Sequence, residues 1–382
     1  MTSRVAVRPK LLRWARERAG FDPGELTHRI PQLPAWERGE KQPTLKQLEG
    51  FAKATHTPIG YLFLPEPPVE GVPIPDLRTI ADEPISRPSP DLLDTLYLCQ
   101  QRQEWYRDFA RAMGERPLAL VGSVRITEDV VPVAAGIRDA LGFDLDERRK
   151  LPTWAEALRR FIEQADAVGV LAMVSGVVGS NNRRKLDPHE FRGFALVDDL
   201  APLVFINGAD TKAAQMFTLA HELVHVWLGQ SALSDAEART VPDHEVERWC
   251  NQVAAELLVP LAVMRAGYNA GAELRTELDR LARRFKVSTL VVLRRIHDAG
   301  WLTQAEYWDA YEAELERLRS LPRGSGGDFY LTLGARVSKR FARALVVSTL
   351  EGRSSFTEAF RLLGFKKMAT FRELGHSLGL GI

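Results

Sequence analysis

The chain of 382 residues contains only two cysteines, Cys99 and Cys250, and they lie far apart in the sequence. We therefore expect no disulfide framework, and so low a cysteine content is typical of proteins from a reducing compartment. The sequence also lacks an apolar run of membrane length and the apolar core of a signal peptide. These absences predict a cytoplasmic protein without a membrane partner.

An excess of charge of either sign is also missing. The 51 Lys and Arg residues nearly balance the 50 Asp and Glu residues, and the formal net charge is +1. This balance argues against a protein that coats nucleic acid over its whole surface. With 45% hydrophobic residues and no internal repeat, the chain is long enough for two or three separate cores.

The most informative pattern that is present is His-Glu-Leu-Val-His at residues 221–225. His221 and His225 are four residues apart, so both imidazoles leave the same face of a helix and can share one metal ion. Glu222 lies beside the first histidine and can reach water activated by the ion, which makes it a candidate general base. Residues 211–229 favour such a helix, because Thr precedes it, Gly ends it and no Pro interrupts it. The alternative is a buried helix whose histidines only satisfy hydrogen bonds.

A catalytic zinc ion normally has three protein ligands, so one more is needed downstream. The next predicted helix, residues 246–259, begins near Glu247. We choose Glu247 because small Ala254, on the same stripe of the helix, allows a close approach to a neighbour. Glu256 and His244 remain alternatives, and any of the three could instead be a solvated surface group.

Short β-rich runs lie upstream of the motif, and the last two are joined by a hairpin-like connection. A strand beside a metal helix could pair with the backbone of an extended substrate, so we expect Arg192, Gly193 and Phe194 to bind substrate. His244 and Tyr268 are candidate oxyanion donors. The predicted strands cover residues 168–174, 191–197 and 203–206.

These segments together resemble a known family. Phe-Thr-Leu-Ala-His-Glu-Leu-Val-His at 217–225, Glu-Arg-Trp-Cys-Asn at 247–251 and Ala-Ala-Glu-Leu-Leu-Val-Pro at 254–260 are similar to segments of the ImmA/IrrE family of bacterial zinc metallopeptidases. The resemblance extends upstream through residues 192–207 and downstream to near residue 300.

The resemblance implies a site and a reaction. His221, His225 and Glu247 correspond to the family's Zn²⁺ ligands, and Glu222 corresponds to its catalytic glutamate. The implied function is a zinc-dependent endopeptidase whose substrate is a transcriptional repressor or an antitoxin-like regulator. Two alternatives stay open: a DNA-binding regulator that uses the metal domain as a sensor, and a scaffold that binds a partner without hydrolysis.

The first 64 residues carry a separate signal. They hold 11 Lys and Arg against 6 Asp and Glu, a balance suited to phosphate contacts. Asp22 and Thr44 each begin a capping box, which predicts two helix starts. Trp-Glu-Arg-Gly at 36–39 and the segment 43–48 resemble the Xre-type helix-turn-helix repressors.

The segment that should form the recognition helix departs from that pattern. Pro31 and Pro34 limit any helix there to about one turn. Gln32, Arg38 and Lys41 are the side chains left to reach base edges, and we retain them as candidate DNA contacts. The sequence thus leaves two interpretations open: a weak DNA-binding module, or a relic that docks a protein or forms a homodimer.

Residues 65–90 hold 8 of the 22 prolines and are predicted to be a linker. Near residue 280 a second helix-turn-helix spacing occurs, with Ser288 as a helix cap, for which we favour packing over DNA binding. The tail, residues 321–382, has 10 Lys and Arg against 4 Asp and Glu. It is interpreted either as a basic surface for nucleic acid or an acidic partner, or as a solvated face.

The predicted fold class is α+β and mostly α, with a zincin-like peptidase domain that contains a small sheet and the motif helix. The predicted domains are a helix-turn-helix-like domain at 1–64, the linker at 65–90, a peptidase domain at 91–305 and a basic helical region at 306–382. The peptidase domain divides into a helical lead-in at 91–167, a catalytic core at 168–270 and helix-turn-helix-like helices at 271–305.

Overall fold

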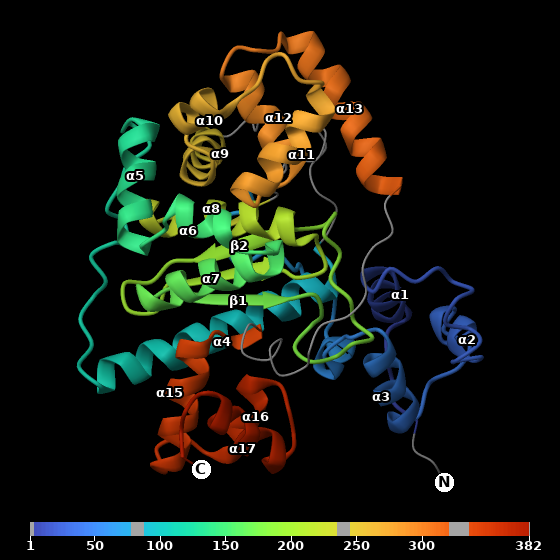
Figure 1. Cartoon of the computed structure of the whole chain (residues 1–382). Helices are drawn as coiled ribbons and strands as arrows, with labels where there is room; N and C mark the ends of the chain where they lie inside the picture. The colour runs from blue at the N-terminus through green and yellow to red at the C-terminus, as the bar shows by residue number, and fades with distance from the viewer. Residues whose placement is uncertain (1–3, 78–87, 235–244, 321–335, 382) are drawn as a thin grey trace. The chain divides into compact units, whose positions relative to one another are not determined.

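The computed structural model describes residues 4–77, 88–234, 245–320 and 336–381 (Figure 1). These residues form two compact units, one with residues 4–73 and 88–96 and the other with residues 74–77 and the described residues from 97 onward. None of the helices in these ranges is both long and apolar enough to cross a membrane. The structure is α+β, as predicted, with one small mixed sheet among many helices.

The elements in chain order are α1 Pro9–Arg18, α2 Leu33–Glu37, α3 Leu45–Ala54, η1 Ile59–Phe63, α4 Pro90–Ala112, α5 Val130–Leu141, α6 Leu145–Lys150, α7 Trp154–Ala167, β1 Leu171–Ser175, β2 Gly193–Leu196, β3 Leu203–Asn207, α8 Lys212–Leu228, β4 Ala232–Ser234, α9 Glu245–Leu258, α10 Leu261–Gly267, α11 Leu274–Phe285, α12 Thr289–Asp298, α13 Gln304–Ser320, α15 Lys339–Leu350, α16 Phe356–Leu363 and α17 Met368–Ser377.

The first unit confirms one of its two predicted helix starts. At α3, the Thr44 hydroxyl accepts a hydrogen bond from the Gln47 amide at 3.3 Å, and the Gln47 side chain accepts one from the Thr44 amide at 2.9 Å. The start predicted at Asp22 is wrong, because residues 23–29 form successive turns rather than a helix. The Asp22 amide does donate to the Glu25 carboxylate at 2.8 Å, but Gly24 weakens a helix that Pro31 would soon end.

The sheet lies in the second unit and has the order β1-β3-β2-β4. Strand β1 is parallel to β3, whereas β2 is antiparallel to both β3 and β4. Every residue of the four strands is buried. Burial on both faces explains why the strands read as continuous apolar runs without polar alternation.

Helices cover both faces of the sheet. Ala172, Ala195 and Val204 face the core shared with α7 and α8. On the opposite face, where α4 runs beneath the sheet (Figure 1), the rings of Phe194 and Phe205 stack at 5.0 Å. Helix α8, which carries the motif, therefore rests on a sheet that is itself supported from below.

The helices α15 to α17 belong to the same unit and are joined to the sheet layer by buried polar contacts. The carboxylate of Asp166, at the end of α7, accepts hydrogen bonds from the Ser338 hydroxyl at 2.7 Å and from the Lys339 amide at 3.0 Å. The Arg102 guanidinium, buried in α4, donates to the Leu362 carbonyl at 2.9 Å. Both cysteines are free and buried.

Candidate metal centre

Helix α8 places the two motif histidines in the core. Its capping residue Thr211 accepts a hydrogen bond from the Ala214 amide at 3.2 Å, and Gly229 ends it with a left-handed backbone, as predicted from these residue types. His221 and His225 are both 0% exposed, and their Nε2 atoms lie 3.1 Å apart. One face of the helix therefore presents two imidazole nitrogens at a single point.

Helix α9 packs against α8 and brings Glu247 to the same point. One carboxylate oxygen of Glu247 lies 3.0 Å from His225 Nε2 and the other lies 3.2 Å from His221 Nε2. These three residues form a group whose ligand atoms all lie within 4.8 Å of one another. The structure thus brings together the three residues that the sequence selected as ligands.

The spacing of this group fits a divalent cation. Tetrahedral Zn²⁺ with bonds of about 2.0–2.2 Å holds its ligand atoms roughly 3.3 Å apart. The observed separations of 3.0 to 3.2 Å are close to that value. Two imidazoles and one carboxylate also match the ligand types of catalytic zinc sites, although other divalent ions accept the same donors.

The pKa shifts of His221, His225 and Glu247 also fit a site for a cation. Burial disfavours the charged imidazole, yet the Glu247 carboxylate raises the pKa of His221. Burial likewise opposes ionisation of Glu247, but the two histidines outweigh it and hold the pKa of Glu247 well below its usual range. Burial together with neighbouring His221 lowers the pKa of His225. The Glu247 carboxylate thus stays ionised in a buried position, and a positive charge beside it is favoured.

Glu222 is the remaining member of the motif and is 0% exposed. Burial raises the pKa of its carboxyl group to about 8, although nearby His221 opposes the shift. Within the described residues neither carboxyl oxygen completes a hydrogen bond. Buried polar atoms normally have partners, so this carboxyl group is arranged for a ligand or water rather than for the fold.

Gly193 of β2 allows the sheet to approach Glu222 closely. A Cβ atom at this position would lie 2.6 Å from Thr218 Cγ2 and 2.8 Å from Glu222 Oε1. Ser234 pairs with Gly193 in the sheet and also lies beside Glu222. Sequence reasoning missed Ser234, because β4 has only three residues and gives no strand pattern.

Glu256 and His244 were the alternative candidates for the third metal ligand. Glu256 is bonded elsewhere: it pairs with the Arg295 guanidinium and accepts a hydrogen bond from the Leu261 amide at 3.1 Å. His244 lies outside the described residues. The second candidate oxyanion donor, Tyr268, stacks against Trp301 at 4.1 Å, and burial, together with the nearby Glu277 carboxylate, raises the pKa of its hydroxyl.

The prediction that Arg192, Gly193 and Phe194 pair with substrate requires them to lie at an edge of the sheet. The structure contradicts this requirement. Strand β2 is an interior strand whose main chain is hydrogen-bonded to β3 on one side and β4 on the other. Arg192 forms an ion pair with Asp210 at 3.1 Å, and Phe194 is fully buried. The edge strand on the motif side of the sheet is β4, which the sequence did not reveal.

The candidate DNA contacts of the first unit are exposed. Helix α2 has five residues, which confirms the predicted limit of about one turn, and its Leu33 and Trp36 face the core. Gln32, Arg38 and Lys41 lie around it on the surface. Arg38 already forms an ion pair with Glu40 at 2.6 Å, so its positive charge has a partner within the same unit.

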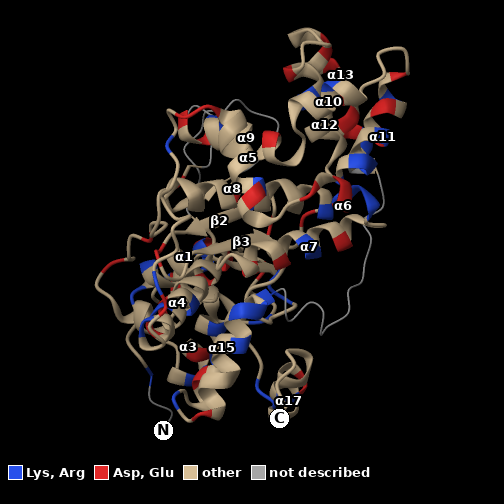
Figure 2. Cartoon of the chain, turned by 60° about the vertical axis from the view of Figure 1, so that its left-hand side comes forward, with Lys and Arg blue, Asp and Glu red and all other residues tan. Residues whose placement is uncertain are grey.

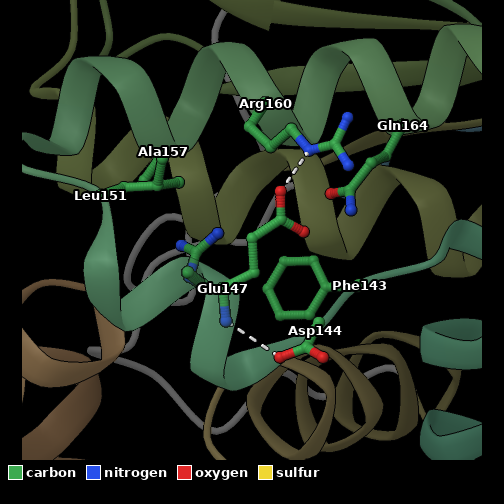
Figure 3. Close-up of a pocket in the computed structure, with 8 residues that line it drawn as sticks. Phe143, Asp144, Glu147, Leu151, Ala157, Arg160 and Gln164 are labelled. Atoms are coloured by element: carbon green, nitrogen blue, oxygen red, sulfur yellow. Dashed lines mark hydrogen bonds and ion pairs between the residues drawn. The ribbon is translucent and has the colours of Figure 1, made fainter.

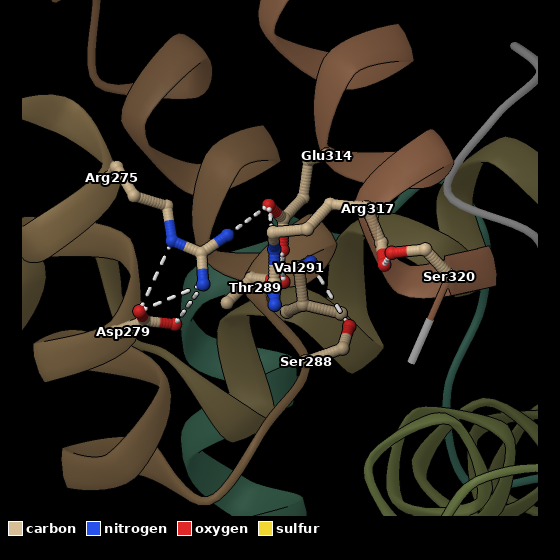
Figure 4. Close-up of polar contacts among 8 residues, drawn as sticks. All are labelled: Arg275, Asp279, Ser288, Thr289, Val291, Glu314, Arg317 and Ser320. Atoms are coloured by element: carbon tan, nitrogen blue, oxygen red, sulfur yellow. Dashed lines mark hydrogen bonds and ion pairs between the residues drawn. The ribbon is translucent and has the colours of Figure 1, made fainter. Parts of the chain in front are cut away.

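The helices of the second predicted helix-turn-helix, α11 and α12, pack against each other and are both bonded to α13. Ser288 caps α12 as predicted, accepting a hydrogen bond from the Val291 amide at 3.2 Å. Buried Glu314 of α13 binds Arg275 of α11 at 2.7 Å, Arg317 at 2.6 Å and the Thr289 hydroxyl (Figure 4). A network of this kind holds α11, α12 and α13 together, which favours packing over DNA binding.

The basic residues at the start of α15 are paired as well. Lys339 contacts the Glu163 carboxylate at 2.8 Å, and Arg340 contacts Glu115 at 3.1 Å. Figure 2 shows basic segments in blue at α15. Two positive charges of the tail are thus paired with carboxylates of the same chain.

A small hollow between α6 and α7 is distinct from the metal group (Figure 3). Its lining includes Arg148, whose guanidinium donates to the carbonyl oxygens of Phe285 at 2.9 Å and Lys286 at 3.1 Å. The hollow thus lies at a structural junction between α6 and α11. The complete lining is Phe143, Asp144, Glu147, Arg148, Leu151, Ala157, Arg160 and Gln164.

Residues 165–297 match a peptidase family. The matching model is Peptidase_M78, described as the IrrE N-terminal-like domain, and it covers about a third of the chain. This IrrE-like region (residues 165–297) contains the sheet and the metal group, and the match supports a metallopeptidase-type activity. Residues 337–377, which contain α15 to α17, match a domain of unknown function, DUF8813. No curated protein matches the chain.

Proposed function

We propose that the chain is a zinc-dependent endopeptidase that cleaves a specific protein in the cytoplasm. The observation that carries the proposal is the convergence of His221, His225 and Glu247, with separations of 3.0 to 3.2 Å, beside the buried carboxyl group of Glu222. The peptidase family match over residues 165–297 supports the same reaction class.

The proposed roles follow from the chemistry of each group. His221, His225 and Glu247 would hold Zn²⁺, which when bound lowers the pKa of water and polarises a carbonyl group. Glu222 accepts the proton of the attacking water and delivers it to the leaving amine. The pKa of about 8 for this buried carboxyl group is suited to proton transfer, and a cation beside it would lower that value.

The proposed substrate is a transcriptional repressor or an antitoxin-like regulator. This part rests on the resemblance to the ImmA/IrrE family and on the helical first unit, which offers a second surface for recognising a regulator or its DNA. In the competing proposal the first unit binds DNA and the metal group only senses a cation. Exposed Gln32, Arg38 and Lys41 favour that alternative, whereas the single turn of α2 weakens it.

The test replaces Glu222 by Gln, which keeps the size of the side chain and removes the proton acceptor. We expect cleavage of a regulator co-expressed from a neighbouring gene to fall by about 10²-fold or more, while metal content stays unchanged. Glu245→Gln, at an exposed position at the start of α9, is the matched control and should leave both unchanged.

A second variant separates hydrolysis from metal binding. His221→Ala should lose the bound metal as measured by elemental analysis of protein purified without chelators. Wild-type activity in the Glu222→Gln protein would reject hydrolysis at this site and leave the sensor alternative. Metal content that is unaffected by His221→Ala would reject the proposed ligands.

A further inference from the structure

The outer edge of β4 is already paired with a segment that precedes β4 by more than 150 residues of sequence. The Leu77 amide donates to the Leu233 carbonyl at 3.0 Å, and the Leu233 amide donates to the Pro75 carbonyl at 2.9 Å. Asp76 therefore forms a parallel bridge with Leu233. An isolated bridge from the proline-rich segment thus occupies the outer edge of β4, the last strand of the sheet.

This edge lies next to the candidate catalytic carboxyl group. Ser234, the neighbour of Leu233, pairs with Gly193, and both residues lie beside Glu222. The remaining strands offer no equivalent position, because β2 and β3 are paired on both sides and β1 lies at the far end of the sheet. Of the described strands, β4 is the one whose outward-facing main-chain groups, here bonded to Pro75 and Leu77, are placed to hold an extended peptide near Glu222.

From this placement we propose that the outer edge of β4 is the docking strand for an extended protein substrate, and that the chain's own residues Pro75–Leu77 occupy it until the substrate displaces them. The inference rests on the proposed peptidase function and adds the manner in which substrate reaches the site. It also assigns residues Pro75–Leu77 an inhibitory role within the same chain.

The chemistry of the segment suits a competitor that can be displaced. Pro73 and Pro75 restrict the backbone to extended conformations, which prepares the segment for pairing with a strand. Proline has no amide hydrogen, so the segment cannot extend its ladder at these positions, and two main-chain hydrogen bonds hold it to β4. Pro75 and Asp76 are exposed, and Ile74 and Leu77 are only half-buried, so none of these side chains is fully enclosed. A substrate strand with all its amides can form a longer ladder.

The test weakens the pairing of residues Pro75–Leu77 with β4. It then asks whether a separate peptide of the same sequence binds the β4 edge. In full-length protein, Leu77→Pro removes the amide that donates to Leu233. The probe is a fluorescent synthetic peptide with the sequence of residues 70–77. We expect it to bind the Leu77→Pro protein at least about fivefold more tightly than the wild type, since one hydrogen bond has been lost. Cleavage of casein should accelerate by a similar factor, and the peptide should inhibit it.

The matched control is Val69→Pro, a change to proline in the same segment at a fully exposed residue, which should behave as the wild type in both assays. If circular dichroism shows that Leu77→Pro is misfolded, replacing residues 74–77 by Gly-Ser-Gly-Ser provides a second test. Equal peptide binding by wild type and variants overturns the inference, as does binding that leaves casein cleavage unchanged. If no protein cuts casein but the binding difference persists, the peptidase function fails while the occupancy of the β4 edge stands.

Discussion

At the scale of single residues, Gly193 is the tightest position around the candidate site. Its Cα faces Thr218 and Glu222 of α8 on one side and the Phe205 carbonyl of β3 on another. A glycine here lets the strand approach the motif helix within backbone contact distance.

Gly193→Ala is therefore expected to destabilise the fold and disturb Glu222. The added Cβ would lie 2.6 Å from Thr218 Cγ2, 2.8 Å from Glu222 Oε1 and 2.9 Å from the Phe205 carbonyl, so strand or helix must shift. We expect a loss of about 1–3 kcal/mol in the free energy of unfolding, measured by chemical denaturation.

The same substitution elsewhere provides its control. Gly136 lies inside α5, where an added Cβ meets no atom within 4 Å. Gly136→Ala should stabilise the protein by about 0.5–1 kcal/mol, because alanine is the better helix former. Equal effects of the two substitutions would mean that the contact of β2 with α8 does not limit the site.

At the scale of elements, the start of α15 is anchored by a buried carboxylate. Ser338 is 0% exposed, caps the helix through the Phe341 amide at 3.3 Å and donates to Asp166. Removing its hydroxyl leaves the Asp166 carboxylate with fewer donors in a buried position. Ser338→Ala should therefore cost about 2–3 kcal/mol of unfolding free energy, which combines a lost cap with a weakened buried hydrogen-bond network.

A second helix cap separates these two contributions. Ser355 caps α16 through the Glu358 amide at 3.1 Å but is itself exposed. Ser355→Ala should cost about 1 kcal/mol, the usual value for a cap alone. Both variants can be compared by urea denaturation, and a Ser338 effect no larger than the Ser355 effect would contradict the anchoring role of Asp166.

Elements whose signals are local could be predicted from the sequence. Helix α8 has a capping Thr211, a terminal Gly229 and the two motif histidines within one stretch, so its bounds and its ligands could be located. Glu247 could be proposed because small Ala254 marks the face of α9 that approaches α8. Helix α2 could be limited to one turn because prolines act on their immediate neighbours.

Features that depend on distant partners could not be predicted. Strand β4 is three residues long, and its pairing with β2 and with residue Asp76 involves segments far apart in the sequence. Because β4 pairs with β2, β2 lies inside the sheet. The sequence alone wrongly suggested that β2 is an edge strand. Of the capping box predicted at Asp22, the bond from the Asp22 amide to Glu25 forms, but a single local contact is not enough to nucleate a helix.

At the scale of the whole molecule, the chain divides into two units and the metal group lies in one of them. The first unit has its own core, formed around Leu11, Trp36 and Phe51. The second contains the sheet, the IrrE-like region and the helices α15 to α17. Such a chain need not unfold in one transition, because each unit has its own stability.

Metal binding should therefore stabilise one unit and not the other. A cation that binds only the folded site at a concentration 100 times its Kd adds about 2.7 kcal/mol of stability, or a rise of roughly 5 °C in the melting temperature of that unit. Scanning calorimetry with Zn²⁺ and then with a chelator should move the transition of the second unit and leave that of the first in place. In Glu247→Gln the neutral amide cannot replace the carboxylate between two buried imidazoles, so the shift should largely disappear. A shift that is unchanged in this variant, or that affects both transitions equally, would place the bound metal somewhere other than His221, His225 and Glu247.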